Sequence, residues 1–119
     1  MARYLILIYG NEARWDAMSD AEQRVIDEGH QAFRAKAGTA VLASGELEGT
    51  ASATTLRRGD GAAPVITDGP YAESKEVLGG FYIVRAADLD EAIGYAGTLG
   101  ELAQDHCSVE VRPLVDHGE

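Results

Sequence analysis

Two short segments of the sequence are apolar on both of the faces that a β-strand presents. Residues 3–9 read RYLILIY and residues 81–85 read FYIVR, with aliphatic, β-branched and aromatic side chains at consecutive positions. Such short runs are typical of buried strands, in which successive side chains point to opposite faces of a sheet. A sheet built on these segments therefore has two apolar faces, and both must be covered.

The rest of the chain supplies helices and further strands. Ser19 and Glu22 have the spacing of a capping box and predict a helix that ends at Gly38. Asp88 and Glu91 repeat that spacing before a second helix. The remaining segments are predicted strands at residues 40–47 and 107–114, and a hairpin formed by residues 51–58 and 64–67 around Gly59-Asp60-Gly61.

This order of elements is strand, helix, strand, hairpin, strand, helix, strand. It is the split βαβ or ferredoxin-like pattern with an inserted hairpin, so we expect an α+β fold whose antiparallel sheet carries two helices on one face. Apolar surface left in water on the other face costs about 25 cal/mol for each Å². The sequence therefore predicts a homodimer in which a second copy packs sheet to sheet around a two-fold axis, forming a dimeric α+β barrel.

Length and charge limit the classes of function. The 119 residues are the size of one ordinary domain, predicted to span residues 1–119. Ten Lys and Arg residues against twenty Asp and Glu residues give a formal net charge of -10. Like charges repel, so we expect neither nucleic acid nor an anionic membrane as a direct partner.

The cysteine content and the N-terminus indicate a cytoplasmic protein. Cys107 is the single cysteine and cannot form an internal disulfide, and the N-terminal apolar run is too short for a signal peptide or a membrane span. No metal site is expected, because His106 and Cys107 are adjacent and would point to opposite faces of a strand. No Gly-rich nucleotide loop is present, and we expect no cofactor.

Ionisable side chains are most concentrated in residues 67–84, TDGPYAESKEVLGGFYIV. Asp68 opens a turn whose glycine and proline would present the carboxylate at a fixed angle. The alternative is that Asp68 only caps its own turn. Glu73 and Lys75 follow in the same loop, where they either bind a polar ligand or remain solvated.

Several separated motifs resemble the DGPF-domain proteins, a branch of the YCII-related family. DGPYAESKEVLGGFYIV is similar to the signature of that branch, with Tyr71 where the family name has Phe. RYLILIYGNEARW, ASGELEG and SVEVRPL also resemble the family, in order and over nearly the whole chain. The resemblance implies a ferredoxin-like fold, dimeric α+β barrels and a relation to small isomerase-like and catabolic enzymes. It also implies a regulatory setting, since DGPF-type proteins occur as partners or fusions of extracytoplasmic-function sigma factors.

The resemblance further implies a His and Asp pair as the active site, for which the best matches are His30 and Asp68. Asp68 lies in the signature itself, whereas His30 is matched by a helical HxxF pattern that ends at Phe33. A carboxylate beside a histidine fixes the tautomer, so that the free ring nitrogen can move a proton near neutral pH. The alternative is a partly exposed His30 satisfied by a neighbouring group. Gly29 costs the helix about 1 kcal/mol relative to Ala, which indicates close packing or a pocket nearby.

Three classes of function remain open on the sequence. The first is a cofactor-free enzyme with acid-base chemistry on a small carbonyl-containing or anionic metabolite, with Lys75 or Arg112 holding the anion and with Glu73 and Tyr71 nearby. Tyr71 and Tyr82 suit a pocket with polar tips, although core packing explains them more simply. The second class is a non-catalytic ligand-binding or accessory module that uses the same pocket. The third is an interaction subunit whose important surface is its dimer interface.

Overall fold

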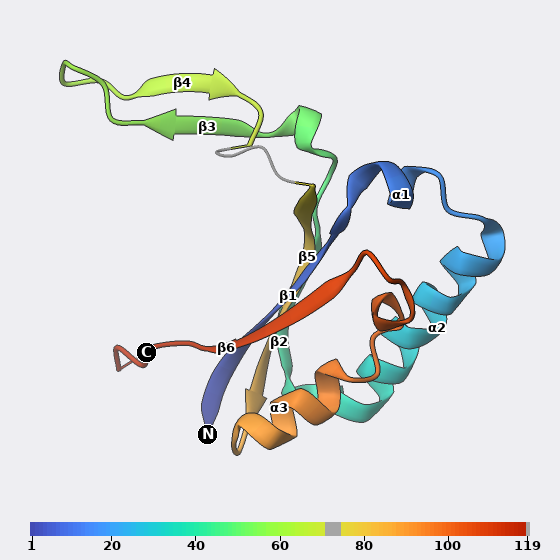
Figure 1. Cartoon of the computed structure of the whole chain (residues 1–119). Helices are drawn as coiled ribbons and strands as arrows, with labels where there is room; N and C mark the ends of the chain where they lie inside the picture. The colour runs from blue at the N-terminus through green and yellow to red at the C-terminus, as the bar shows by residue number, and fades with distance from the viewer. Residues whose placement is uncertain (71–74, 119) are drawn as a thin grey trace.

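The computed structural model describes residues 1–70 and 75–118, which form a four-stranded and a two-stranded antiparallel sheet (Figure 1). The main sheet has the order β2-β5-β1-β6, and its strands are β1 (Ala2–Asn11), β2 (Val41–Glu46), β5 (Glu76–Ala86) and β6 (Ser108–Pro113). The second sheet is a hairpin of β3 (Thr54–Arg57) and β4 (Val65–Asp68). The helical elements are α1 (Glu12–Asp16), α2 (Asp20–Ala37), α3 (Leu89–Ala96) and the 3-10 turns η1 (Gly38–Ala40), η2 (Thr50–Ser52) and η3 (Gly100–Ala103). The ferredoxin-like α+β fold with an inserted hairpin is confirmed.

Local hydrogen bonds explain where the helices begin. The Ser19 hydroxyl accepts from the Glu22 backbone N–H at 3.2 Å, and the Glu22 carboxylate accepts from the Ser19 N–H at 3.1 Å, which completes the predicted capping box of α2. Asp88 caps α3 by accepting from the Glu91 N–H at 2.9 Å. Helix α1 was not predicted, and it starts where the Asn11 side chain accepts from the Arg14 N–H.

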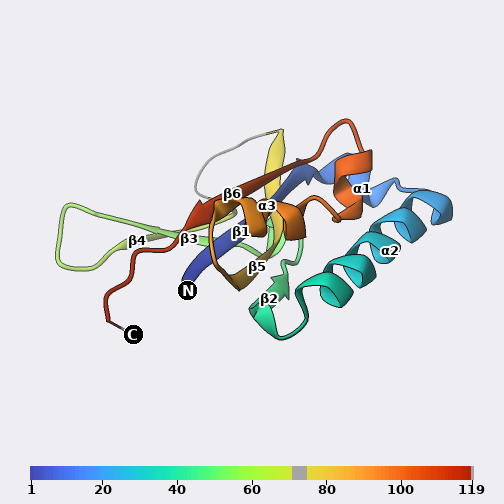
Figure 2. The same cartoon turned by 90° about the horizontal axis from the view of Figure 1, so that it is seen from below.

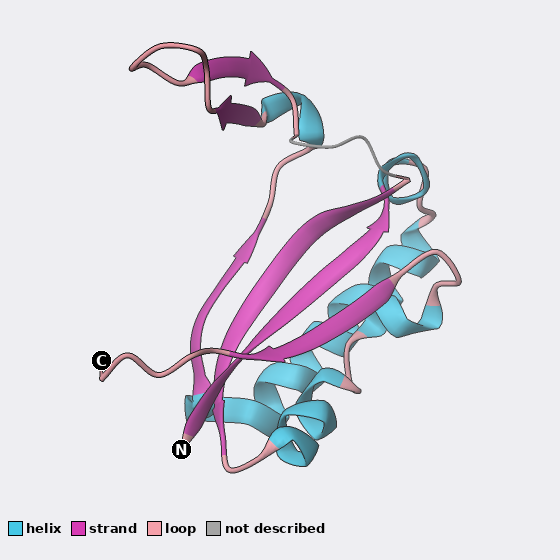
Figure 3. Ribbon diagram, turned by 60° about the vertical axis from the view of Figure 1, so that its left-hand side comes forward, coloured by secondary structure: helices cyan, strands magenta, loops and turns pink. Residues whose placement is uncertain are grey.

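The core lies between the main sheet and the helices α2 and α3, which share one face of it (Figure 2, Figure 3). Ile6 of β1, Val84 of β5 and Phe33 of α2 are fully buried there. The Phe33 ring lies against that of Tyr82, with the ring centroids 4.2 Å apart. This layer therefore fixes α2 over strand β5.

The opposite face of the main sheet is the outer face, defined here by Leu5 and Leu7 of β1 and Phe81 and Ile83 of β5. The strand register places Leu5 beside Ile83 and Leu7 beside Phe81, and Gly45 of β2 leaves room for the Phe81 ring. These side chains are half-buried. The molecule is only 19 Å thick in its thinnest direction, about the depth of one sheet and one helix layer. Within the described residues, α2 and α3 both lie on the other face (Figure 3).

The β3–β4 hairpin projects beyond the end of the main sheet (Figure 1). Its strands occupy the predicted segments, with Leu56 paired to Ile66 and both exposed. Asp68 ends β4, opposite Thr54. No helix among the described residues is long and apolar enough to cross a membrane.

Candidate functional site

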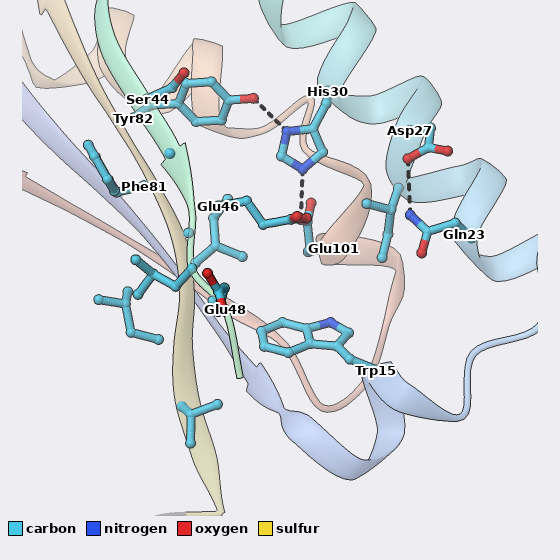
Figure 4. Close-up of a pocket in the computed structure, with 18 of the residues that line it drawn as sticks. Trp15, Gln23, Asp27, His30, Ser44, Glu46, Glu48, Phe81, Tyr82 and Glu101 are labelled. Carbon is cyan, nitrogen blue, oxygen red and sulfur yellow. Dashed lines mark hydrogen bonds and ion pairs between the residues drawn. The ribbon is translucent and has the colours of Figure 1, made fainter. Parts of the chain in front are cut away.

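A cavity of about 630 Å³ opens between α2, α1 and the β2–β5 edge of the main sheet (Figure 4). Its size is in the range typical of small-molecule sites. Its walls combine aromatic, glycine and carboxylate-bearing positions. The described residues that matter most for its chemistry are Trp15, His30, Arg34, Glu46, Glu48, Tyr82 and Glu101.

At the wall of the cavity His30 bridges two polar side chains from distant parts of the chain. Its Nδ1 lies 2.6 Å from the Tyr82 hydroxyl, and its Nε2 lies 2.7 Å from Glu101 Oε2. His30 comes from α2, Tyr82 from β5 and Glu101 from η3. The His30 side chain is 22% exposed and the Glu101 side chain 8%. The carboxylate paired with His30 in this chain is thus Glu101.

The hydrogen bonds also indicate the tautomer of His30. When Glu101 is ionised its oxygen can only accept, so Nε2 then carries a proton and donates to Glu101. In the neutral form of His30, Nδ1 accepts from the Tyr82 O–H. Burial raises the pKa of Tyr82, and the negative charge of Glu101 raises it further, while the Arg34 guanidinium opposes the shift. Tyr82 is therefore held in its protonated, donating form.

Two glycines allow the backbone contact that brings His30 and Glu101 together. A Cβ on Gly29 would lie 2.1 Å from the Gly100 backbone nitrogen, and a Cβ on Gly100 would lie 2.2 Å from the Val25 carbonyl oxygen. Only glycine fits at such distances, so α2 and η3 touch backbone to backbone. The next residue along each segment is His30 and Glu101. The close packing predicted at Gly29 is confirmed.

Trp15 forms another wall of the cavity, and it too depends on glycines. A Cβ on Gly10 or Gly79 would lie 2.3 or 2.7 Å from the indole, so its six-membered ring lies directly against the backbones of β1 and β5. The Trp15 Nε1 donates to Gln104 Oε1 at 3.3 Å. The LGG segment of the signature therefore serves in part to accommodate this indole.

The charged side chains that line the cavity are mostly acidic. The described lining residues include six carboxylates against one guanidinium, Arg34; the carboxylates are Glu12, Asp16, Asp27, Glu46, Glu48 and Glu101. Some are satisfied locally: Glu12 accepts from the backbone and hydroxyl of Thr50, and the hydroxyl contributes most to lowering the pKa of Glu12. Glu101 Oε1 is buried and has no hydrogen-bond partner among the described residues.

The other residues predicted for the site lie elsewhere. Asp68 is exposed at the end of β4, and the described lining of the cavity does not include it. Lys75 lines a separate hollow with Thr50. Arg112 belongs to β6 on the outer-face side, where its Nε donates to Glu110 at 3.0 Å. Their proposed roles in catalysis and substrate binding stay predictions. Tyr71 and Glu73 lie outside the described residues.

His106 and Cys107 precede β6, and the Cys107 Sγ lies 3.5 Å from His106 Nδ1, so the prediction that the two side chains point to opposite faces of a strand is wrong. Burial raises the pKa of the Cys107 thiol to about 11, which keeps it protonated and a poor nucleophile near neutral pH. His106 Nδ1 accepts from the Asn11 backbone N–H at 2.9 Å. Within residues 1–70 and 75–118, no three His, Cys, Asp or Glu side chains are grouped to hold a metal ion.

Comparison with known proteins agrees with the motifs. An uncharacterised protein of Rhizobium meliloti (strain 1021) is 37% identical over 113 residues, which cover 93% of this chain and 90% of that protein. A solved structure of 5-chloro-2-hydroxyhydroquinone dehydrochlorinase from Burkholderia phenoliruptrix AC1100, in complex with 2,5-dihydroxybenzoquinone, is 20% identical, covers 96% of this chain and 95% of its own, and has a TM-score of 0.44. The family model of the YCII-related domain matches residues 2–115, and this chain therefore belongs to the YCII-related domain family.

Proposed function

We propose that this chain is a small enzyme that transfers protons on a carbonyl-containing metabolite in the cavity beside His30. The observation that carries the proposal is the hydrogen-bonded series Tyr82, His30 and Glu101, with distances of 2.6 and 2.7 Å. A histidine held by a buried carboxylate on one side and a hydroxyl on the other has the parts of a proton relay. All three residues line the cavity.

The relay works through enol and ketone forms of the substrate. An enol hydroxyl donates to the Tyr82 oxygen, and as it gives up its proton the Tyr82 proton moves to His30 Nδ1. The imidazolium that forms is stabilised by Glu101. The enolate takes a proton at carbon from solvent, and the imidazolium returns its proton to solvent, so the net reaction converts enol to ketone. Because burial raises the pKa of Tyr82, the two proton movements occur together instead of through a free tyrosinate.

The enzyme acts as a homodimer in this proposal. The outer face carries an apolar surface formed by Leu5, Leu7, Phe81 and Ile83. Exposing this surface to water costs free energy in proportion to its area, which disfavours the monomer. Sheet-to-sheet packing of a second copy would cover this surface. Phe81 is also among the residues that line the cavity, and it is adjacent to Tyr82 on β5. A second copy on the outer face would therefore pack against the strand that carries Tyr82.

The proposal is tested by deuterium uptake. A panel of small enolisable ketones is incubated with the protein in D₂O, and exchange next to the carbonyl is followed by proton NMR. Tyr82→Phe and Glu101→Gln keep the shape of each side chain, and His30→Ala removes the relay. We expect roughly 10²–10⁴-fold slower exchange without His30, the usual contribution of a positioned acid-base group.

His117→Ala is the matched control, since His117 lies in the exposed C-terminal segment. This variant should catalyse deuterium exchange of the ketone at the wild-type rate. Exchange that survives His30→Ala would reject the relay. Saturable binding of a ketone without any exchange would instead identify a ligand-binding module.

A further inference from the structure

We propose that the cavity is selective for a small organic cation, an ammonium ion in place of the anion that the sequence suggested. The inference rests on the proposed function only in placing the ligand in the same cavity. It goes further by naming the charge of the ligand and the groups that recognise it.

The first argument is the charge of the walls. Of the described lining residues, six carry carboxylates and one carries a guanidinium. Asp27 accepts from Gln23 at 3.0 Å and Glu48 from the Ser52 hydroxyl at 3.2 Å, and neither neutral partner cancels charge. The Glu46 side chain has no hydrogen bond or ion pair with any described residue, while its backbone pairs with β5. A concave site lined by one sign of charge concentrates ligands of the opposite sign.

The second argument is the unsatisfied oxygen of Glu101. This residue is only 6% exposed, and its Oε1 has no partner among the described residues, while Oε2 binds His30. A carboxylate oxygen requires a donor when it is removed from water. An ammonium ion brings several donors and a compensating charge, whereas a carboxylate ligand brings neither.

The third argument is the aromatic wall. The face of Trp15 lies across the space from Glu46 and Glu101 (Figure 4). Its Nε1 is already engaged by Gln104, so the ring offers its π face and no further donor for an anion. A cation over an indole face is attracted by the ring quadrupole. Carboxylates on one side and an indole on the other form a site suited to an ammonium group.

The residues expected to hold an anion do not reach this site. Arg112 pairs with Glu110 on β6, and its neighbour across the strands is Leu5 of the outer face. Lys75 lines a different hollow. Among the lining residues that the structure describes, Arg34 carries the guanidinium, and its field acts on Tyr82. A negative ligand would therefore meet one guanidinium amid the carboxylates.

The test compares three ligands that share one scaffold: phenethylamine, 2-phenylethanol and phenylacetate. Trp15 is the single tryptophan of the chain, so its fluorescence reports binding in the cavity. At low salt we expect the amine to bind at least about tenfold more tightly than phenylacetate, with the alcohol between them. Raising the salt concentration should lower the ratio of amine affinity to phenylacetate affinity, because salt screens the carboxylate charges.

Charge-removing variants then locate the selectivity. Glu46→Gln and Glu48→Gln should each lower the ratio of amine to phenylacetate affinity by roughly threefold to tenfold. Glu28→Gln is the matched control, because Glu28 is an exposed carboxylate of α2 outside the described lining. It should leave the ratio unchanged.

The outcomes separate this inference from the proposed function. Equal binding of the three ligands, tighter binding of phenylacetate, or no binding of the amine would each overturn cation selectivity. Binding is also measured in His30→Ala, which abolishes the relay. If the wild type binds the amine selectively but catalyses no deuterium exchange, cation selectivity stands and the proposed enzyme activity is rejected. If the wild type catalyses exchange of anionic ketones alone, the enzyme activity stands and cation selectivity is rejected.

Discussion

Replacing Gly29 by Ala tests the backbone contact on which the His30–Glu101 pair depends. In an isolated helix this change is favourable, because Ala is about 1 kcal/mol better than Gly in a helix interior. Here the new Cβ would lie 2.1 Å from the backbone nitrogen of Gly100. Ordinary contacts begin near 3.4 Å, so the two backbones must separate by roughly 1.3 Å.

The steric term should exceed the gain in helix propensity. Overpacking a well-packed interior costs about 1–3 kcal/mol, and the upper part of that range applies where a backbone atom, not a flexible side chain, is the obstacle. After the helix gain, we expect Gly29→Ala to lower the free energy of unfolding by about 1–2 kcal/mol. For a domain of this size the melting temperature should fall by roughly 4–8 °C.

Gly94→Ala provides the matched control. Gly94 also lies within a helix, α3, but a Cβ there would meet only the Lys36 ammonium at 3.6 Å, an ordinary contact. This variant should melt at a higher temperature than the wild type, by up to roughly 4 °C. Both variants are compared by circular dichroism during heating. If Gly29→Ala stabilises the protein as Gly94→Ala does, the proposed contact between α2 and η3 is wrong.

Two further predictions concern the outer face and the buried thiol. The proposed homodimer would bury the outer face, so Leu7→Glu would bury a charge there and light scattering should record half the wild-type mass. Ile93→Glu, at a 49% exposed position of α3, should not change the mass. An unchanged mass for Leu7→Glu would reject the proposed interface. Burial raises the pKa of the Cys107 thiol from 9.0 to about 11, so the unfolded chain loses this proton first and the free energy of unfolding falls as pH rises between these values. Urea denaturation across that pH range should show a smaller fall in the free energy of unfolding for Cys107→Ala than for the wild type. An identical fall in the two proteins would contradict a raised pKa of Cys107.

Most of the fold was predictable because its signals are local. The capping box at Ser19, the N-cap at Asp88 and the turn at Gly59-Asp60-Gly61 act over a few residues, and the structure has the corresponding elements. Helix α1 was missed because a five-residue helix carries too little periodicity, although Asn11 is a regular N-cap.

The site was predictable only in part, because its key contact is not local. His30 could be selected from the sequence, but its carboxylate partner lies 71 residues away in an unremarkable 3-10 turn. The pairing depends on two backbones that touch at Gly29 and Gly100, and a glycine does not indicate which segment it approaches. Tyr82 was noted as a pocket residue, yet its bond to His30 requires the packing of α2 on β5.

The alternation of side chains along β5 has a consequence for evolution. Tyr82 bonds His30 on the helix side, while its immediate neighbours Phe81 and Ile83 project from the reverse side of the same strand. A one-residue insertion or deletion just before this point would exchange the two sets, placing a phenol among the outer leucines and a hydrocarbon beside the imidazole. Natural variants of this chain should therefore tolerate length changes in the projecting hairpin, while the number of residues between Gly80 and Ala86 stays constant.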